Sequence, residues 1–244
     1  MTRVAIIAAL PGELHPLVRG WEHQSRNGVE IWSWRHREGQ WFAACAGVGV
    51  NAAARAFAEI EKEDAIDSVF SVGWAGALAE RYVAGRAYRV SGVIDAQTGE
   101  RTGIPTPPGG CWLVTAHRVA NPAEKRRLAA THGASLVDME AAGIARLAQK
   151  RGIPFHCVKG VSDGPADRLP DFNAFISADG RFQPVRFVLS VLVRPWHWAA
   201  LARMGRNSRK AARSLGEELL RLLDEGATLR RPEDRSTPRR QTPD

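Results

Sequence analysis

Short apolar runs bounded by turn residues recur along the first two thirds of the chain, and each is long enough for one buried strand. Eight strands are predicted, at residues 3–10, 29–35, 41–46, 68–73, 87–94, 112–115, 135–137 and 155–161. Helical periodicity predicts helices at 13–19, 51–62, 122–131 and 140–151. This alternation predicts an α/β fold, a single domain with a central mixed, mostly parallel twisted sheet flanked by helices.

Polar residues mark several element ends. Asn121 before Pro122 predicts a helix start, with proline at the first helical position, and Asn51 is predicted to cap the helix at 51–62. Residues 99–110 are rich in Thr, Pro and Gly and are predicted to form a loop. From about Ala227 the chain is rich in Arg, Pro, Asp and Thr, so we expect a domain at 1–224 and a disordered tail at 225–244.

The apolar run at 4–10 follows Arg3 and could also suit a signal sequence. Pro11 and Gly12 come at once after it, so a buried first strand is the better interpretation. No run reaches the roughly 18 apolar residues that span a bilayer. The chain has three cysteines without C-x-x-C spacing, which favours buried thiols in a reducing cytoplasm over disulfides.

The positive charge is confined to one segment. The net charge is +8, yet residues 180–216 contain eight basic residues and no Asp or Glu, which leaves 34 − 8 = 26 basic against 26 acidic residues elsewhere. The segment includes the apolar run 187–193, then Trp196 and Trp198, then a helical stretch at 199–223.

Two interpretations of this basic segment stay open. One is a buried apolar helix, a turn, and an amphipathic terminal helix with a solvated basic face. The other is peripheral contact with an anionic membrane, because Trp favours the headgroup level and basic residues attract anionic lipid. Nucleic-acid binding is disfavoured, since no motif or interleaved aromatic pattern accompanies the charges.

Carboxylates follow the ends of three predicted strands. Glu13 comes just after the first strand, and Asp163 just after the strand at 155–161. Asp138 and Glu140 stand where the strand at 135–137 meets a helix. Ligands of open α/β sheets bind outside the carboxyl ends of the strands, so these acids are placed for chemistry. Each acid alone has an ordinary explanation, because acids are common in first helical turns and loops.

Two glycine turns complete the pattern, Gly-Val-Gly at 47–49 and Gly-Trp-Ala-Gly at 73–76. The first lacks the third glycine of a dinucleotide fingerprint, so alone it indicates only a strand-to-helix turn. In this order, the four stretches at residues 8–14, 46–51, 71–78 and 137–164 resemble the purine nucleoside phosphorylase and uridine phosphorylase superfamily. The resemblance covers roughly residues 3–167. The similarity is closest to its methylthioadenosine/S-adenosylhomocysteine nucleosidases, and the turn at 139–141 with the Ser-Asp loop at 162–163 is the specific part.

The resemblance implies an enzyme that breaks an N-glycosidic bond, with a role for each matching residue. Asp163 is the implied acid that protonates the purine near N7, an effect worth typically about 10²–10⁴-fold. Glu13 is the implied base for water, Glu140 the acceptor for both ribose hydroxyls, and Met139 the contact on the sugar face. The other implied substrate-binding residues are Asp138, Gly76, Ala75, Val119, Ala120 and Ser162.

Departures from the family pattern bear on substrate and nucleophile. The family holds the base by backbone groups at the positions of Val119 and Ala120, and its usual aromatic ring is missing at Val119. Trp74 replaces a small hydroxyl residue, and the stretch 78–111 is short, which suggests an open 5′ side and a bulky 5′-substituent. No arginine follows the turn at 11–13 before Arg19, which favours hydrolysis over a phosphate-dependent phosphorylase, although the latter stays open.

The basic segment also resembles the hopanoid-associated branch of the superfamily, whose members convert adenosylhopane to ribosylhopane. That similarity predicts a cytoplasmic enzyme at the inner membrane face, with a methylthioadenosine/S-adenosylhomocysteine nucleosidase as the alternative. A non-catalytic nucleoside- or lipid-binding module is the alternative of another class, and the full set of three acids argues against it. No cofactor or metal is expected, because the histidines lack ligand spacing, and the family suggests a homodimer.

Overall fold

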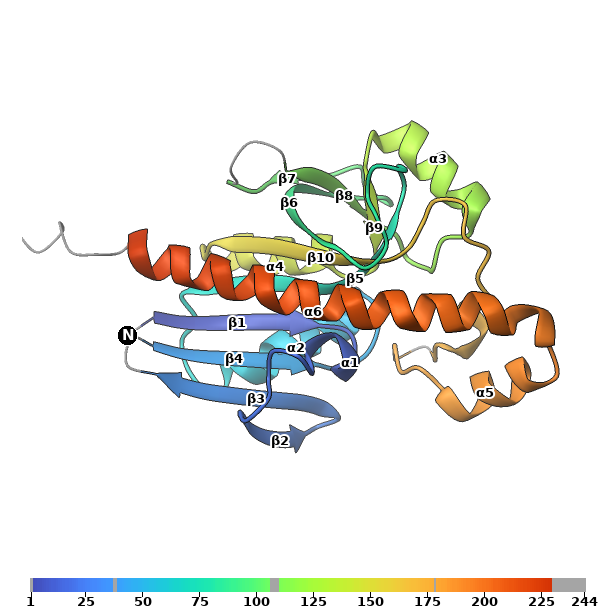
Figure 1. Ribbon diagram of the computed structural model, residues 1–244. Coiled ribbons are helices and arrows are strands. Elements are labelled where there is room, and N and C mark those ends of the chain that lie inside the picture. The colour runs from blue at the N-terminus through green and yellow to red at the C-terminus, as the bar shows by residue number, and fades with distance from the viewer. Residues whose placement is uncertain (1, 37–38, 106–109, 178, 230–244) are drawn as a thin grey trace, which may run out of the picture.

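The computed structural model describes residues 2–36, 39–105, 110–177 and 179–229 (Figure 1). Its strands are β1 (Thr2–Ala8), β2 (Glu22–Arg26), β3 (Val29–His36), β4 (Gly39–Cys45), β5 (Ser68–Ala77), β6 (Ala87–Asp95), β7 (Arg101–Gly103), β8 (Cys111–Thr115), β9 (Leu136–Asp138) and β10 (Phe155–Asp163). Its helices are α1 (Pro11–Leu14), α2 (Val50–Glu61), α3 (Pro122–His132), α4 (Ala141–Arg151), η1 (Asn173–Phe175), α5 (Pro184–Leu192), η2 (Pro195–His197) and α6 (Trp198–Leu229).

The strands form a mixed sheet that is partly closed on itself. Along the sheet the order is β10-β6-β8-β9-β5-β1-β4-β3-β2, and β10 also pairs with β5, so β5, β10, β6, β8 and β9 make a ring. Five of the ten pairings among the described strands are parallel and five antiparallel. The predicted mixed α/β sheet is thus confirmed, whereas its mostly parallel character is wrong, because β6, β8 and β9 run against β5 and β10.

The long strand β5 makes the ring possible. One of its edges pairs first with β1, through residues 68–71, and then with β9, through Gly76 and Ala77, while the other edge pairs with β10 through residues 69–76. The register of β10 shifts between Val161 and Asp163 at the same level. This irregularity bends the sheet where the predicted site residues lie.

Helices cover both faces of the sheet (Figure 1). On one face α2 packs with Phe57 and Ile60 against β1, β3 and β4, and α4 lies beside it against β5, β6 and β10. On the other face the second half of α6 buries Leu215 and Leu219 against β1, β5 and β10. The amphipathic terminal helix is therefore part of the core rather than an appendage.

Several predicted boundaries need correction. The helix predicted at 13–19 is the single turn α1, and strands β2 and β7 were not predicted; β7 lies inside the predicted loop 99–110, of which residues 106–109 fall outside the described residues. Asn51 is an exposed residue within α2, and Gly49 caps that helix with a φ of 95°. By contrast, Asn121 caps α3 as predicted, accepting bonds from two backbone N–H groups.

The basic C-terminal segment does not contain the buried apolar helix that one of its two interpretations predicts. The apolar run predicted as a buried helix is α5, and none of its residues is buried. Helix α6 continues to Leu229, and the rest of the predicted tail lies outside the described residues. All three cysteines are buried and free, as predicted. Within the described chain, no helix combines the length and apolar character needed to cross a bilayer.

Candidate active site

A cavity of about 320 Å³ opens where the carboxyl ends of β1, β5, β9 and β10 meet. All ten residues predicted for the site line it: Glu13, Ala75, Gly76, Val119, Ala120, Asp138, Met139, Glu140, Ser162 and Asp163. The structure thus brings together residues from five separate parts of the chain. Their individual roles stay predictions.

Glu13 is held in a cage of backbone N–H groups. Its Oε2 accepts from Ala9 and Leu10, both at 2.8 Å, and its Oε1 accepts from Trp74 at 2.7 Å. Gly73, with φ at 135°, allows this approach, because a Cβ there would lie 2.7 Å from the Glu13 carboxylate. Burial nevertheless dominates and raises the pKa of Glu13. A fixed carboxylate with a raised pKa is a stronger proton acceptor than an ordinary glutamate.

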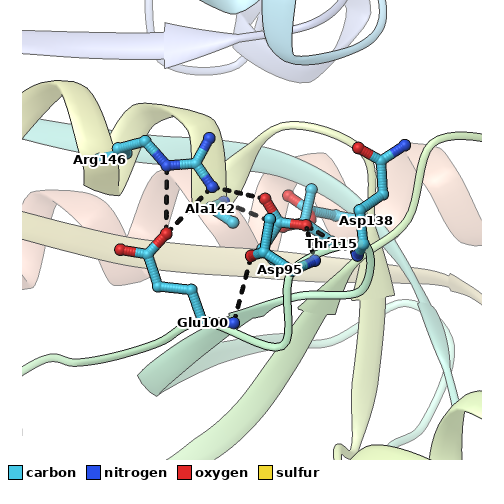
Figure 2. A network of polar contacts seen from close by, with 8 residues as sticks. Asp95, Glu100, Thr115, Asp138, Ala142 and Arg146 are labelled. Carbon is cyan, nitrogen blue, oxygen red and sulfur yellow. Dashed lines mark hydrogen bonds and ion pairs between the residues drawn. The ribbon is translucent and has the colours of Figure 1, made fainter.

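Asp138 anchors the junction between β9 and α4 (Figure 2). Its Oδ1 accepts from Thr115 at 2.7 Å and its Oδ2 from the Ala141 N–H at 2.9 Å. The Lys159 ammonium, 1% exposed, lies 2.9 Å from the same Oδ2. Burial, the largest single effect, lowers the pKa of Lys159, but Asp138 and the other neighbouring acidic groups together outweigh it and raise that pKa. Both oxygens of Asp138 are thus engaged within the protein, and its substrate contact stays a prediction.

A second layer secures the same junction. Arg146 on α4 bonds Asp95 at 2.6 Å and Glu100 at 3.1 Å, and the Thr115 hydroxyl accepts from the Ala142 N–H (Figure 2). These contacts tie α4 to the end of β6 and to β8.

Glu140 is buried and bonded to the glycine turn. Its Oε1 accepts from the Gly49 N–H at 2.7 Å. Burial, and next the charge of Asp138, raise the pKa of Glu140 to about 7. Gly47 and Val48 donate their N–H groups to Ala9 and Gly180, so all three amides of the turn are engaged within the protein.

Asp163 is paired with a lysine that the sequence analysis did not identify. Lys125, 2% exposed, bonds Asp163 Oδ2 and also the Gly164 carbonyl oxygen at 2.6 Å. Ser162 donates to Asp163 Oδ1 at 2.6 Å. Among the described residues no cluster of three His, Cys, Asp or Glu is arranged to hold a metal ion. Both oxygens of the Asp163 carboxylate are thus engaged, one by Lys125 and one by Ser162.

The backbone of Val119 is already occupied. Its N–H donates to Asn173 Oδ1 at 2.8 Å, and its carbonyl oxygen accepts from Asn173 Nδ2 at 3.1 Å. Binding of a base by this backbone stays a prediction. In the structure, both backbone groups of Val119 bind the side-chain amide of Asn173 from η1.

One wall of the cavity is apolar and comes from outside the predicted set. Phe172, Ile176, Phe182 and Phe187 line it, and stacking at 5.0 Å between the rings of Phe172 and Phe187 joins α5 to η1. These residues lie past the motifs, where the only signal was an excess of aromatic and apolar residues. Lys159 had a clearer signal, since it is a lone charge in the apolar run of β10.

Replacing Lys159 by methionine is expected to lower the free energy of unfolding by about 3–5 kcal/mol, because it leaves Asp138 buried without its partner. Urea denaturation followed by circular dichroism measures the change. Lys150→Met, at an exposed position of α4, is the matched control and should change it by less than about 0.5 kcal/mol. Equal stability of the two variants would contradict the ion pair's role.

Known proteins resemble this chain in sequence pattern and in fold. A family model, that of the phosphorylase superfamily, matches residues 3–107 and 95–184. No curated protein matches. Futalosine hydrolase of Helicobacter pylori superposes with a TM-score of 0.70 at 14% identity, covering 92% of this chain and 98% of that one. The 5′-methylthioadenosine/S-adenosyl homocysteine nucleosidase of the same organism superposes with a TM-score of 0.69 at 14% sequence identity, and the match covers 92% of this chain and 98% of that one. The Arabidopsis thaliana 5′-methylthioadenosine nucleosidase superposes with a TM-score of 0.68 at 15% sequence identity, and the match covers 92% of this chain and 96% of that one.

Proposed function

Because the chain belongs to the phosphorylase superfamily, we propose that it hydrolyses the N-glycosidic bond of a 5′-modified adenosine and releases adenine. The observation that carries this proposal is the convergence of Glu13, Glu140 and Asp163 on one cavity. The solved structures that it resembles include nucleosidases acting on methylthioadenosine and a futalosine hydrolase. A nucleoside-cleaving role is the one that suits three buried acids at a sheet edge.

In the proposed reaction the bond between the anomeric carbon and N9 of the base breaks. Asp163 donates a proton to N7, so that adenine leaves neutral, and the ion pair with Lys125 supplies and positions that proton. Water adds to the anomeric carbon and gives its proton to Glu13. Glu140 accepts hydrogen bonds from the ribose hydroxyls. The products are adenine and the free 5′-modified ribose.

Water is the better nucleophile for this cavity than phosphate. Glu13 and Glu140 repel each other's charge and would repel a phosphate dianion, whereas water is neutral. A phosphate site also needs free donors, and the three amides of the turn at 47–49 already donate within the protein. This supports hydrolysis and makes a phosphorylase the weaker candidate.

The 5′-substituent that we propose is a lipid, and adenosylhopane is the specific candidate, giving ribosylhopane. The apolar wall of Phe172, Ile176, Phe182 and Phe187 supports this choice, since apolar side chains bind apolar groups and leave a charged amino acid tail unpaired. Methylthioadenosine, with a small apolar substituent, is the alternative substrate. S-adenosylhomocysteine fits this wall less well.

Adenine release with and without phosphate tests the proposal. The substrates are methylthioadenosine, S-adenosylhomocysteine and adenosylhopane in detergent micelles, with liquid chromatography as the readout. Phosphate-independent release from the lipid establishes the full proposal, and release from methylthioadenosine alone establishes hydrolysis but rejects the lipid. Strict dependence on phosphate would make the protein a phosphorylase, and affinity without release would make it a binding module.

The pH dependence of kcat/KM is expected to reflect Glu140. Its pKa, raised to about 7, leaves it ionised above that pH and protonated below, and only the carboxylate accepts from both ribose hydroxyls. We therefore expect kcat/KM to fall as the pH drops through about 7, and Glu140→Gln to lose this acidic limb while KM rises. An unchanged limb in Glu140→Gln, measured between about pH 5 and 9, would assign the limb to another group.

A further inference from the structure

Helix α5 turns its most apolar face outward. Val185, Val188, Leu189 and Leu192 are between 52% and 71% exposed. They are spaced i, i+3, i+4 and i+7, so they form one continuous stripe along the helix. In a helix of a globular protein such a stripe normally faces the core.

The face of α5 that points toward the protein is packed against the aromatic wall of the cavity. Phe187 points to the cavity wall, where its ring lies 5.4 Å from those of Phe175 and Phe182. In Figure 1, α5 stands away from the sheet, beside the first turns of α6. The outward stripe is therefore additional apolar surface that the described fold does not cover.

Two tryptophans extend the stripe. Trp196 in η2 is 70% exposed and Trp198, at the start of α6, is 52% exposed. The indole N–H of Trp198 donates to the Val191 carbonyl oxygen at 2.9 Å, which fixes the ring against α5. Indole rings with one apolar and one polar edge favour the boundary between hydrocarbon and headgroups.

The charged residues of the segment 184–198, Arg186 and Arg194, are both arginines, while the acid Asp171 lines a pocket together with Arg194. Residues 180–216 contain no acid, and Arg186 and Arg194 donate to neutral oxygen atoms of Gln183 and Ser190. Both guanidinium groups are exposed, so their charge is available to an external anion. Arginines beside an apolar stripe match anionic headgroups above an acyl layer.

We infer that the surface formed by α5 and η2, residues 184–198, docks on a bilayer that contains anionic lipid. The stripe and the tryptophans enter the headgroup boundary, and the arginines bind phosphate groups. A second copy of the chain fits worse, because a symmetric contact would bring the like charges of two acid-free segments together. Binding to such a bilayer does not depend on the proposed chemistry of the cavity.

Docking in this way would also orient the cavity. Phe187 lies on the inner side of the helix whose outer side meets the lipid, so the apolar wall stands one helix away from the bilayer. Only the connection between docking and substrate delivery to the cavity rests on the proposed function. It offers a lipid-linked nucleoside a short path between bilayer and cavity.

Flotation of the full-length protein with vesicles tests the inference. Vesicles of phosphatidylcholine and phosphatidylglycerol in equal parts should bind the protein, more weakly at high salt, and pure phosphatidylcholine should bind less. Val188→Glu should lower the partition coefficient about tenfold or more, because it places a carboxylate in the stripe. The matched control is Val83→Glu, since Val83 has the same 52% exposure in a different part of the surface, and it should bind like the unmodified protein.

Three results would overturn the inference. These are no binding of the unmodified protein, equal binding of the Val188 and Val83 variants, and a dimer in light scattering that Val188→Glu dissociates. Leu192→Glu replaces Val188→Glu if circular dichroism shows that the latter does not fold. Adenine release from methylthioadenosine and from adenosylhopane in detergent micelles separates the two proposals. We expect this release to be the same in Val188→Glu, and its absence with both substrates in every protein would reject the chemistry while leaving vesicle binding intact.

Discussion

Asparagine in place of Asp163 is expected to lower kcat for adenine release by about 10²–10⁴-fold, because the amide cannot donate an acidic proton to N7. The carboxamide keeps the size of the side chain and one oxygen that can accept from Lys125 or Ser162. Since proton donation belongs to the transition state, kcat and kcat/KM should fall together. Steady-state kinetics with methylthioadenosine or an adenosyl lipid measures both constants.

Asp95→Asn is the matched control. Asp95 is also a partly buried carboxylate in an ion pair, with Arg146 at 2.6 Å, but it lies outside the residues that line the cavity. It should lose some stability and keep its kcat within a few fold. A kcat for Asp163→Asn above about one tenth of the unmodified value would reject the acid role, given the size of the effect expected.

Glu13→Gln is expected to lower kcat by a similar factor, about 10²–10⁴-fold, since an amide cannot accept the proton of water. It should also destabilise the fold. Three N–H groups point at the two carboxylate oxygens, so an NH₂ group on either side must face a donor, at a cost of about 1–3 kcal/mol.

The two effects can be separated with a second buried glutamate. Glu59 on α2 is 7% exposed against 5% for Glu13, and it accepts from Arg26, Asn27 and Lys62 instead of lining the cavity. Glu59→Gln should therefore reduce stability without a comparable loss of kcat. Normal activity in Glu13→Gln at a temperature where it is folded would show that another group activates water.

Apolar periodicity predicted the strands that are buried and not those that are exposed. The segment Glu22–Arg26 consists of polar residues and pairs only with β3 at the edge of the sheet, so its strand conformation comes from its neighbour and not from its own pattern. The closure of β5, β10, β6, β8 and β9 into a ring could not be predicted from the apolar pattern either. It depends on β10 pairing with both β5 and β6, and no local pattern specifies a register between distant strands.

The acids of the site could be predicted because they occur in recognisable stretches at strand ends. The groups that support them could not, with the exception of Lys159, which interrupts an apolar strand. Lys125 precedes Arg126 and Arg127 in a helix and looks like a surface residue until the fold brings its side chain to Asp163. Asn173 and the aromatic wall lie beyond the motifs, where the chain carries no signature of its role.

If the Val119 backbone binds the base as predicted, Asn173 competes with the base for the same two backbone groups. A carboxamide presents a donor and an acceptor side by side, and so does the edge of adenine that carries N6 and N1. A base that binds this backbone must displace Asn173, so the number of hydrogen bonds does not change. Its apparent dissociation constant is then the intrinsic constant divided by the fraction of molecules in which η1 has moved away. A change that loosens η1 would tighten binding without touching the ligand.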